Sequence, residues 1–399
     1  MNHFLYQLKR VKLKELSELW KLPIAMICAI FYRIKHNDLW IICEDPNEAR
    51  DNGYWFFKYL RKEHPEQDCV YAISSKSPDI NKIRELGNWV EFGSLKHWIL
   101  YLASTKKISS QKAGNPNAAI FYFLEVYGFL KDNRIFLQHG VIINDLKWLY
   151  YDVTKMHRFI CGAYPEYEFI RNNFGYPLEN VVYTGICRFD GLHDNISDDT
   201  RIILIMPTWR EWIADEDSRL LQYEGTKDIA KTNYFINWIS FLKDQELERI
   251  ANQYNCRFIF FPHRNMQKYM DLFPRSTYYL EVADARQYDV QNLMKKASLM
   301  ITDYSSVFMD MLYMKKPVIF YQFDYDRFRM GQYGEGYFSY TQNPFAKSYI
   351  TKKDVLVALE QKISEGFAVS NEYLLAHKEY FRLYDNSNCK RVYLVVKES

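Results

Sequence analysis

The sequence predicts an α/β protein built from two doubly wound, Rossmann-like domains. From residue 39 onward, short β-rich runs alternate with amphipathic segments of helical period, which is typical of parallel sheets with crossover helices. The chain has 399 residues, too many for one such sheet. The polar stretch GLHDNISDDT (191–200) precedes a new strand and is typical of a domain boundary. We therefore expect domains at 36–195 and 196–399 after a basic segment at 1–35, with the last helices, after Tyr373, crossing back.

The expected strands fall into two series along the chain. The first series holds LWIIC (39–43), CVYAIS (69–74), KISS (107–110), RIFLQ (134–138) and RFICG (158–162). The second holds VVYTG (181–185), RIILIM (201–206), RFIFF (257–261), YYLEV (278–282), SLMIT (298–302) and PVIFY (317–321). Among the segments between strands, 239–254 carries an apolar stripe at helical spacing and predicts one helix.

Composition and cysteine spacing exclude several classes of protein. Hydrophobic residues make up 48% of the chain and charged residues 25%, as in ordinary globular proteins. The seven cysteines are scattered, without a CxxC pair, and no HExxH motif occurs, so zinc and redox motifs are unsupported. An odd, scattered set of cysteines predicts buried thiols in a reducing cytoplasm. The net charge of +3 argues against a nucleic-acid partner.

The N-terminal segment concentrates the positive charge. Residues 1–35 carry seven Lys or Arg and two Glu, a net charge of +5, whereas the remaining residues sum to −2. Within this segment, LPIAMICAIFY (22–32) is apolar but too short to span a bilayer, and no signal-peptide cleavage pattern follows it. Apolar residues near helical spacing, separated by basic ones, predict a helix lying on an anionic membrane surface. The alternative is a helix that packs on the body of the protein.

Polar residues directly follow or end five of the expected strands, at the edge where parallel sheets bind ligands. In chain order they are His139 and Gly140; Arg188 and Asp190; Thr208, Trp209, Arg210 and Glu211; His263 and Arg264; and Thr302, Asp303, Ser305 and Ser306. Each alone is compatible with a structural role, such as a helix cap or a core histidine. Five such motifs at one kind of edge favour a functional cleft.

The residue types at this edge are those that bind an anionic ligand. Arginine pairs with phosphate oxygens, and a helix start such as the one expected after Ser305 and Ser306 adds backbone donors. The two hydroxyls are also expected to cap that helix. Neither a Walker A motif, nor GxGxxG after a strand, nor GxSxG occurs, so ordinary ATP or dinucleotide binding and a serine-nucleophile elbow lack support.

Six stretches of the sequence resemble the CDP-glycerol glycerophosphotransferase family, whose members prime and polymerise wall teichoic acids and related capsular polymers. They are DLWIICEDPNEARDNGYWFFKYLRKEHPE (38–66), FLQHG (136–140), GICRFDGL (185–192), MPTWRE (206–211), FFPHRN (260–265) and ITDYSSVFMDMLYMKKPVIFYQFDYDRF (301–328). The last stretch is the most specific. Two positions depart from the usual pattern of the family, since Cys187 and Arg264 stand where proline is common.

The resemblance implies a GT-B architecture, in which two Rossmann-like domains face a central cleft, at the cytoplasmic face of the cell membrane. It implies that the first domain binds the acceptor and the second binds the donor. Carried over position by position, it makes His139 the catalytic base and His263 a second catalytic residue. The implied donor-binding residues are Thr208, Trp209, Arg210, Arg264, Thr302, Asp303, Ser305 and Ser306, and further cleft residues are Gly140, Arg188, Asp190 and Glu211.

The implied reaction transfers a polyol phosphate from CDP-glycerol or CDP-ribitol to a hydroxyl of an undecaprenyl-linked or similar lipid acceptor. CMP leaves, with His263 and Arg210 balancing charge on the diphosphate. No cofactor or metal is implied, and a Mg²⁺ requirement stays open. Two alternatives remain: a GT-B glycosyltransferase that uses a nucleotide sugar, and a non-catalytic membrane-bound scaffold that binds polymer.

Overall fold

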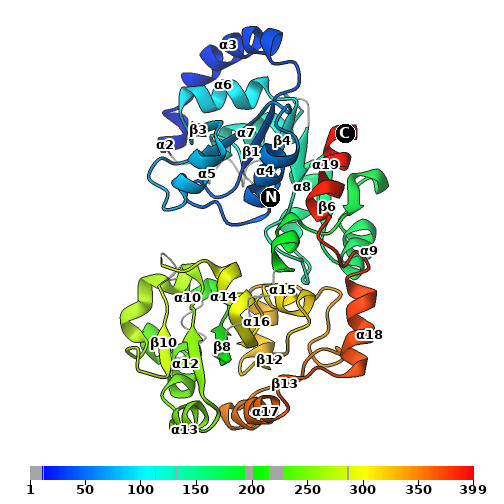
Figure 1. The fold of residues 1–399 in the computed structure, drawn as a ribbon. Coiled ribbons are helices and arrows are strands. Elements are labelled where there is room, and N and C mark those ends of the chain that lie inside the picture. The colour runs from blue at the N-terminus through cyan, green and yellow to red at the C-terminus, as the bar shows by residue number, and fades with distance from the viewer. Residues whose placement is uncertain are drawn as a thin grey trace. The chain divides into compact units, whose positions relative to one another are not determined.

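A computed structural model of the chain describes residues 11, 13–112, 114–128, 130, 133–193, 201–214, 228–284 and 287–399. The chain forms two compact units. Unit 1 comprises residues 1–139, 147–191 and 385–399, and unit 2 comprises residues 140–146 and 192–384, as far as they are described. Both units are α/β in construction (Figure 1).

Unit 1 contains a seven-stranded parallel sheet in the order β3-β2-β1-β4-β5-β6-β7. Its strands are β1 (Trp40–Cys43), β2 (Cys69–Ile73), β3 (Trp89–Glu91), β4 (Lys106–Ser109), β5 (Arg134–Phe136), β6 (Arg158–Cys161) and β7 (Val181–Tyr183). The strand order reverses between β1 and β4, and in doubly wound sheets this switch point is where ligands bind. The prediction of a Rossmann-like fold is therefore confirmed for this unit.

Two expectations about the strands were wrong or incomplete. The strand at 181–185 was assigned to the second series, but β7 pairs with β6 and closes the first sheet. The edge strand β3 was missed because three residues are too few to show an alternating pattern. The central strands were predictable because β1 and β2 are buried throughout, and strands covered on both faces read as continuous hydrophobic runs.

The helices of unit 1 connect these strands. They are α2 (Leu13–Leu16), α3 (Lys21–Lys35), α4 (Asn52–Glu63), α5 (Ile80–Leu86), α6 (Leu95–Ala103), α7 (Ala118–Val126), α8 (Tyr151–Thr154), α9 (Tyr164–Asn173) and α19 (Asn388–Glu398). Short 3₁₀ turns lie at Lys147–Leu149, Leu178–Asn180 and Cys187–Leu192. The C-terminal helix α19 belongs to this unit although it is distant in sequence, and the ring of Tyr393 lies 5.8 Å from that of Trp40.

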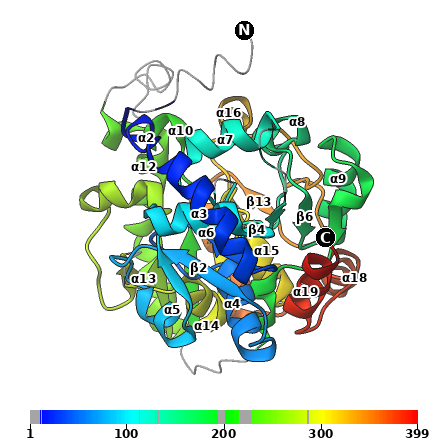
Figure 2. The same cartoon turned by 90° about the horizontal axis from the view of Figure 1, so that it is seen from above.

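Helix α3 packs on α6 with a narrow face and leaves its apolar side exposed. Figures 1 and 2 both show α3 lying along α6. Ala25 and Ala29, one turn apart, are buried against the core that includes Trp98. The Arg33 guanidinium donates to the carbonyl oxygens of Leu102 and Ala103, which end α6. The part of the basic segment at residues 1–10 and 12 lies outside the described residues.

Unit 2 repeats the same architecture with a six-stranded parallel sheet in the order β10-β9-β8-β11-β12-β13. Its strands are β8 (Arg201–Met206), β9 (Cys256–Phe260), β10 (Leu280–Val282), β11 (Ala297–Thr302), β12 (Val318–Tyr321) and β13 (Ser348–Tyr349). The switch point of this sheet lies between β8 and β11, so Pro207 and Asp303 follow the two strands that flank it. The two-residue edge strand β13 was not predicted.

The helices of unit 2 are α10 (Glu211–Ala214), α12 (Asn233–Leu242), α13 (Gln245–Tyr254), α14 (Val290–Lys296), α15 (Phe308–Tyr313), α16 (Tyr325–Gly331), α17 (Lys352–Ser364) and α18 (Asn371–Tyr380). Two 3₁₀ segments lie at Ile229–Lys231 and Arg264–Leu272. The single helix predicted at 239–254 is in fact the end of α12 and all of α13. The Asp244 side chain accepts a hydrogen bond from the Glu246 N–H and starts a new helix there.

Within the described part of the chain, none of the helices is both long enough and apolar enough to cross a membrane.

Candidate functional site

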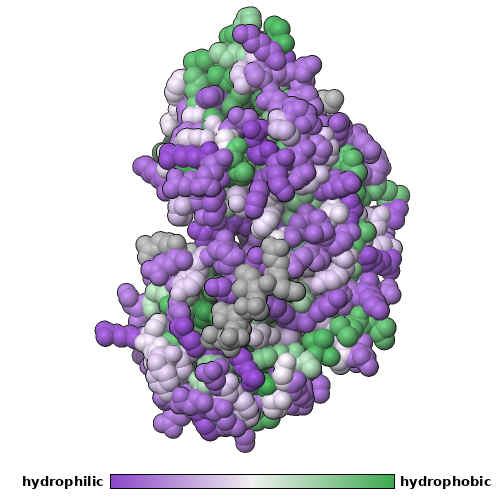
Figure 3. All heavy atoms as spheres, viewed as in Figure 1, coloured by the Kyte–Doolittle hydropathy of each residue, from purple (hydrophilic) through white to green (hydrophobic). Residues whose placement is uncertain are grey.

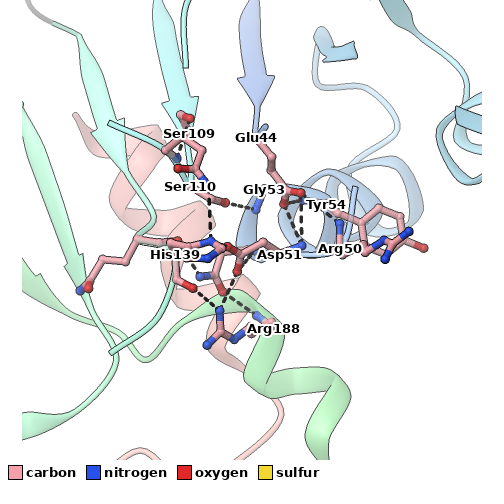
Figure 4. A network of polar contacts seen from close by, with 12 residues as sticks. Glu44, Arg50, Asp51, Gly53, Tyr54, Ser109, Ser110, His139 and Arg188 are labelled. Atoms are coloured by element: carbon pink, nitrogen blue, oxygen red, sulfur yellow. Dashed lines mark hydrogen bonds and ion pairs between the residues drawn. The ribbon is translucent and has the colours of Figure 1, made fainter. Parts of the chain in front are cut away.

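A network of polar side chains occupies the switch point of unit 1 (Figure 4). It is assembled from the ends of three strands and the start of one helix. Glu44 follows β1, Ser110 follows β4 and His139 comes shortly after β5, while Asp51 precedes α4. Figure 4 shows these side chains converging, with Arg188 approaching from the 3₁₀ turn at Cys187–Leu192. The network therefore lies where a parallel sheet of this order binds its ligand.

His139 is the exposed member of this network. Its side chain is 69% exposed, and its Nδ1 lies 2.5 Å from Oδ2 of Asp51. The preceding residue, Gln138, has a φ of +63°, in the left-handed region, and is fully buried. This unusual backbone turns the chain at the end of the β5 segment and presents His139 outward. The charge of Asp51, opposed by burial, raises the pKa of His139 above its ordinary value.

Asp51 joins His139 to Arg188 and to the start of α4. Its Oδ1 accepts hydrogen bonds from Nη1 of Arg188 at 2.8 Å and from the N–H of Asn52, the first residue of α4, at 2.8 Å. Burial disfavours the charged form of Asp51, but His139 and Arg188 outweigh it, and the pKa of Asp51 lies below its ordinary value. Arg188 also donates to the carbonyl oxygen of His139. Both the ring and the backbone of His139 are thus held.

Glu44 lies beneath this network and is buried. Its carboxylate accepts hydrogen bonds from the backbone N–H groups of Arg50, Asp51 and Tyr54. Burial and the nearby charge of Asp51 raise the pKa of Glu44 to about 7, against the opposing effect of these donors. A Cβ on Gly53 would lie 2.8 Å from Cγ of Glu44, so the close approach requires glycine.

Glu44 and Asp51 were not among the predicted site residues. The signal that marks them is the same as for the others, since EDPNEARDNG (44–53) directly follows β1, a strand that adjoins the switch point. An aspartate before Asn-Gly is typical of a turn or a helix cap, so the local sequence predicts only a structural role for Asp51. Its contacts with His139 and Arg188 join residues that are 88 and 137 positions away in sequence.

The corresponding edge of unit 2 holds a second cluster of predicted residues. The Thr302 hydroxyl donates to the carbonyl oxygen of Met206 at 2.6 Å, which joins the ends of β11 and β8. Oδ1 of Asp303 accepts from the N–H groups of Thr208 at 2.7 Å and Tyr304 at 2.6 Å. These bonds bring the loops after β8 and β11 together, as predicted from their positions at strand ends.

Arg210 lies within this cluster and is completely buried. Its guanidinium forms a two-point pair with Asp324, at 2.8 and 2.9 Å, and its Nη2 lies 2.9 Å from Oδ2 of Asp303. It also lies over the rings of Tyr304 and Phe328. These contacts indicate a structural role for Arg210, because its side chain has no exposed surface and its guanidinium already pairs with two carboxylates inside the unit. This differs from the predicted contact with a diphosphate.

Ser305 and Ser306 do not cap the helix that follows them. Helix α15 begins at Phe308, and no side chain accepts a hydrogen bond at its flanking residue, Val307. Both serines are half-buried, and neither hydroxyl has a hydrogen-bond partner among the described residues. The prediction that these hydroxyls cap the helix was therefore wrong, because α15 begins at Phe308, whereas a cap at Ser305 or Ser306 requires a helix that begins at 306 or 307.

The other residues predicted in unit 2 lie around the same edge. The ring of Trp209 stacks near that of His263 at a centroid distance of 6.0 Å, and Nδ1 of His263 accepts from the N–H of Asn265. Arg264 follows His263 and is exposed, and Glu211 begins α10 with its N–H bonded to Gln332. The structure therefore brings Thr208, Trp209 and His263 to one strand edge.

Asp190 and Gly140, the remaining predicted site residues, lie outside the His139 network. Asp190 caps α19: its carboxylate accepts hydrogen bonds from the N–H groups of Asn388 and Cys389, both at 2.8 Å. This contact makes Asp190 a structural residue rather than an exposed ligand. Gly140 directly follows His139 in the chain.

Among the described residues, no group of three or more His, Cys, Asp or Glu side chains is placed to hold a metal ion.

Comparison with known proteins identifies relatives of this chain. It is 28% identical to the minor teichoic acid biosynthesis protein GgaB of Bacillus subtilis (strain 168) over 94% of its length, and 21% identical to a teichoic acid poly(glycerol phosphate) polymerase of Staphylococcus epidermidis over 71%. It spans only 41% and 40% of the lengths of these two relatives.

Solved structures extend the comparison to the fold. The wall teichoic acid polymerase TagF superimposes with a TM-score of 0.63 at 16% identity, over 97% of this chain and 98% of that one. A UDP-N-acetylglucosamine 2-epimerase from Listeria monocytogenes gives a TM-score of 0.54 at 12% identity, over 90% and 96%. These likenesses confirm the predicted GT-B class of two-unit α/β fold. The model of the CDP-glycerol:poly(glycerophosphate) glycerophosphotransferase family matches residues 24–398, and the chain belongs to this family.

Proposed function

We propose that this chain transfers a polyol phosphate, most simply glycerol phosphate, from a CDP-polyol to the hydroxyl of a lipid-linked acceptor during synthesis of a teichoic acid or a related polymer. Membership of the family supports the reaction class. Relatives of this chain include both glycerol phosphate and ribitol phosphate polymerases, which supports the two candidate donors.

The observation that carries this proposal is the pairing of an exposed histidine with a buried carboxylate. An ionised Asp51 can only accept hydrogen bonds, so Nδ1 of His139 carries the proton that the two share. In neutral His139 the lone pair then lies on Nε2, on a ring that is 69% exposed. Such a nitrogen is suited to accept the proton of an incoming hydroxyl group.

The proposed step moves one phosphoryl group and one proton. The acceptor oxygen bonds to the β-phosphorus of the CDP-polyol, the bond from that phosphorus to the bridging oxygen breaks, and CMP leaves with the bridging oxygen. Nε2 of His139 takes the hydroxyl proton. Transfers of this kind depend mainly on positioning and charge neutralisation.

We assign donor binding to the strand edge of unit 2. The hydroxyls of Ser305 and Ser306, which have no partner among the described residues, are available for phosphate oxygens. Trp209 and His263, whose rings stack near each other, offer aromatic surfaces at the ends of strands in the same sheet. In this proposal Arg210 acts indirectly, by holding Asp303 and through it the Thr208 loop.

We also propose that α3 attaches the protein peripherally to the cytoplasmic face of the membrane. Its outward residues recur at helical spacing and are largely exposed: Trp20 57%, Ile24 41%, Ile27 60%, Phe31 66% and Ile34 76%. Figure 3 shows hydrophobic residues gathered at the top of the view, over α3. An apolar helical face next to basic residues is suited to the boundary of headgroups and acyl chains.

The reaction is tested by measuring CMP release from CDP-glycerol or CDP-ribitol with a glycerol-phosphate-terminated acceptor. His139→Ala is expected to lower the rate by about 10²–10⁴, as for loss of a general base. The matched control is His36→Ala, because His36 also pairs through Nδ1 with an aspartate, Asp68, at 2.5 Å. Equal activity of the two variants would exclude His139 as the base, and release of a nucleoside diphosphate from nucleotide sugars instead would favour a glycosyltransferase.

The membrane proposal is tested separately by liposome flotation. The double substitution Ile27→Glu and Phe31→Glu is expected to abolish binding to vesicles that contain anionic lipid. Val357→Glu, on α17 of unit 2 and 61% exposed, is the control for adding charge to an exposed apolar position. Binding that is unchanged by the α3 substitutions would refute attachment through this helix.

A further inference from the structure

Unit 1 contains a pocket of about 320 Å³ that the proposed chemistry does not use. It lies among α2, α7, the start of β5 and the loop after β4. The residues that matter for its chemistry are Glu15, Lys112, Asn115, Tyr122, Phe123 and Arg134. This volume is sufficient for a small polar molecule.

Asn115 is a buried polar side chain that lines the pocket. It is 4% exposed, and its Oδ1 has no hydrogen-bond partner among the described residues. A buried oxygen without a donor is costly, and native proteins supply a donor from protein, water or ligand. The carboxylate of Glu15 is a second acceptor on the wall. Together they favour a ligand that carries hydroxyl groups.

The pocket lining also includes cationic side chains. Arg134 is buried, and its Nε lies 3.3 Å from Oε2 of Glu125. The same carboxylate lies 3.4 Å from Nζ of buried Lys107 and accepts a hydrogen bond from the Tyr101 hydroxyl at 2.6 Å. One carboxylate therefore faces two buried cations, and Lys112 adds a third cation on the pocket wall. Arg134 and Lys112 thus bring cationic groups to the pocket lining, and such groups pair with phosphate oxygens.

Apolar and aromatic side chains form the rest of the pocket. Tyr122 and Phe123 lie on α7, and the ammonium group of Lys112 lies 6.0 Å from the centre of the Tyr122 ring. The pocket thus offers oxygen atoms that accept hydrogen bonds, cationic groups and aromatic surfaces. These match, in that order, the hydroxyl groups, the phosphate and the short carbon chain of a polyol phosphate.

The loop after β4 connects this pocket to the candidate base. The Gln111 side-chain nitrogen lies 3.3 Å from Nδ1 of His139, and the next residue, Lys112, lines the pocket. A smaller adjoining void is lined by Gln111, Lys112 and Arg134 together. The Gln111 N–H donates to the Ser109 hydroxyl at 2.9 Å, which holds the loop at the end of the strand.

We infer that this pocket binds a polyol phosphate unit of the acceptor, one or more units behind the hydroxyl that reacts at His139. The inference rests on the proposed function, because it names the acceptor subsite of that reaction. It assigns Lys112 and Arg134 to the phosphate and Asn115 to a polyol hydroxyl.

The test compares Lys112→Met with Lys76→Met, a control at an exposed lysine of the same unit. Methionine keeps an unbranched stem and removes only the charge. Direct binding of a soluble tri(glycerol phosphate) is measured by calorimetry without any donor, so this arm does not depend on catalysis. Loss of one charged contact to phosphate is expected to weaken binding by about tenfold or more. Lys76→Met is expected to bind like the unaltered protein.

The second arm measures steady-state rates. Lys112→Met is expected to raise the apparent KM for the acceptor by a similar factor and to leave the KM for the CDP-polyol unchanged. Equal oligomer affinity in the two variants, or a change in donor KM alone, would overturn the inference. Phosphatidylglycerol vesicles carry the same glycerol phosphate group on a lipid. If vesicle binding depends on Lys112 while binding of the soluble oligomer does not, the pocket is a lipid headgroup site and the acceptor assignment is wrong.

Discussion

Replacing Asp51 by Asn separates its charge from its role at the start of α4. Asparagine is as good an N-cap as aspartate, so the helix is expected to persist. The amide lacks the charge that fixes the proton on Nδ1 of His139. Exchange of a carboxylate for an amide behind a catalytic histidine costs up to about 10⁴ in kcat, and general-base catalysis contributes about 10²–10⁴. We therefore expect kcat to fall by about 10²–10⁴ in Asp51→Asn.

The same change has a smaller effect on stability, which can be judged from burial. The Arg188 side chain is 8% exposed and loses a charged partner, worth about 1.5–3 kcal/mol. The weakened pair with His139 adds little to the loss of unfolding free energy, because the His139 side chain is 69% exposed and solvent screens its interaction with residue 51. A loss of about 1.5–3 kcal/mol leaves most domains folded at 25 °C. Activity and folding are therefore separable in this variant.

The sign of the pH dependence follows from the directions of the two pKa shifts. His139 must be neutral to act as a base, and its pKa is raised by Asp51, so the acidic limb of kcat lies above the ordinary histidine value of about 6.5. In Asp51→Asn this limb is expected to move to lower pH. The stability from the raised pKa of His139 is present below about 6.5 and lost as pH rises through the raised value. The stability from the lowered pKa of Asp51 is present above about 3.9 and lost as pH falls below it.

CMP release measured from pH 5 to 9, together with urea denaturation, tests these expectations. Asp68→Asn is the matched control, because Asp68 pairs with His36 at the same distance but on the surface. A folded Asp51→Asn variant that keeps more than half of the wild-type kcat, with its acidic limb unmoved, would refute the assignment of His139 as a base oriented by Asp51.

Three further predictions concern Arg210 and the two serines of unit 2, and Glu44 of unit 1. Arg210→Met is expected to lower the free energy of unfolding by about 3–5 kcal/mol, since two buried carboxylates lose their partner. Arg249→Met, at a surface ion pair, is expected to change the free energy of unfolding far less, and equal losses on urea denaturation would contradict this. Ser305→Ala with Ser306→Ala is expected to raise the KM for the CDP-polyol without moving the urea midpoint, and a stability loss typical of a missing cap, about 1 kcal/mol, would show that they cap after all. The pKa of Glu44 is raised to about 7, so the contribution of Glu44 to the free energy of unfolding falls as pH rises from 4.5 to 7. Glu44→Gln is expected to remove this pH dependence of stability, and an unchanged dependence between these pH values would contradict the assignment.

Much of the fold was predictable because parallel strands that are buried on both faces have unbroken runs of apolar residues in the sequence. Strands such as β1 and β11 were therefore found nearly to the residue. The edge strands β3 and β13 were not, because two or three residues carry no period. Strand β7 was grouped with the second series although it precedes the expected boundary at 195/196, since its pairing with β6 is a property of tertiary structure.

The candidate site shows the same division between local and long-range information. His139 was predictable because a polar residue that ends a buried strand is a local signal. Asp51 was not, because its partners lie far along the chain and its local signal is that of a helix cap. For Arg210 the residue type suggested a phosphate ligand, whereas only the packing around it shows two internal carboxylates as its partners.

The position of α19 has a consequence for how the polypeptide acquires its structure. Unit 1 is completed by residues from the last part of the chain, where Asp190 receives the first N–H groups of α19 and Tyr393 covers Trp40. During synthesis from the N-terminus, the surface of α4 that α19 covers stays open to solvent until all of unit 2 has been made. Expression of unit 1 by itself would accordingly need a rearranged gene, in which 385–399 is joined by a short linker to the remainder of the unit.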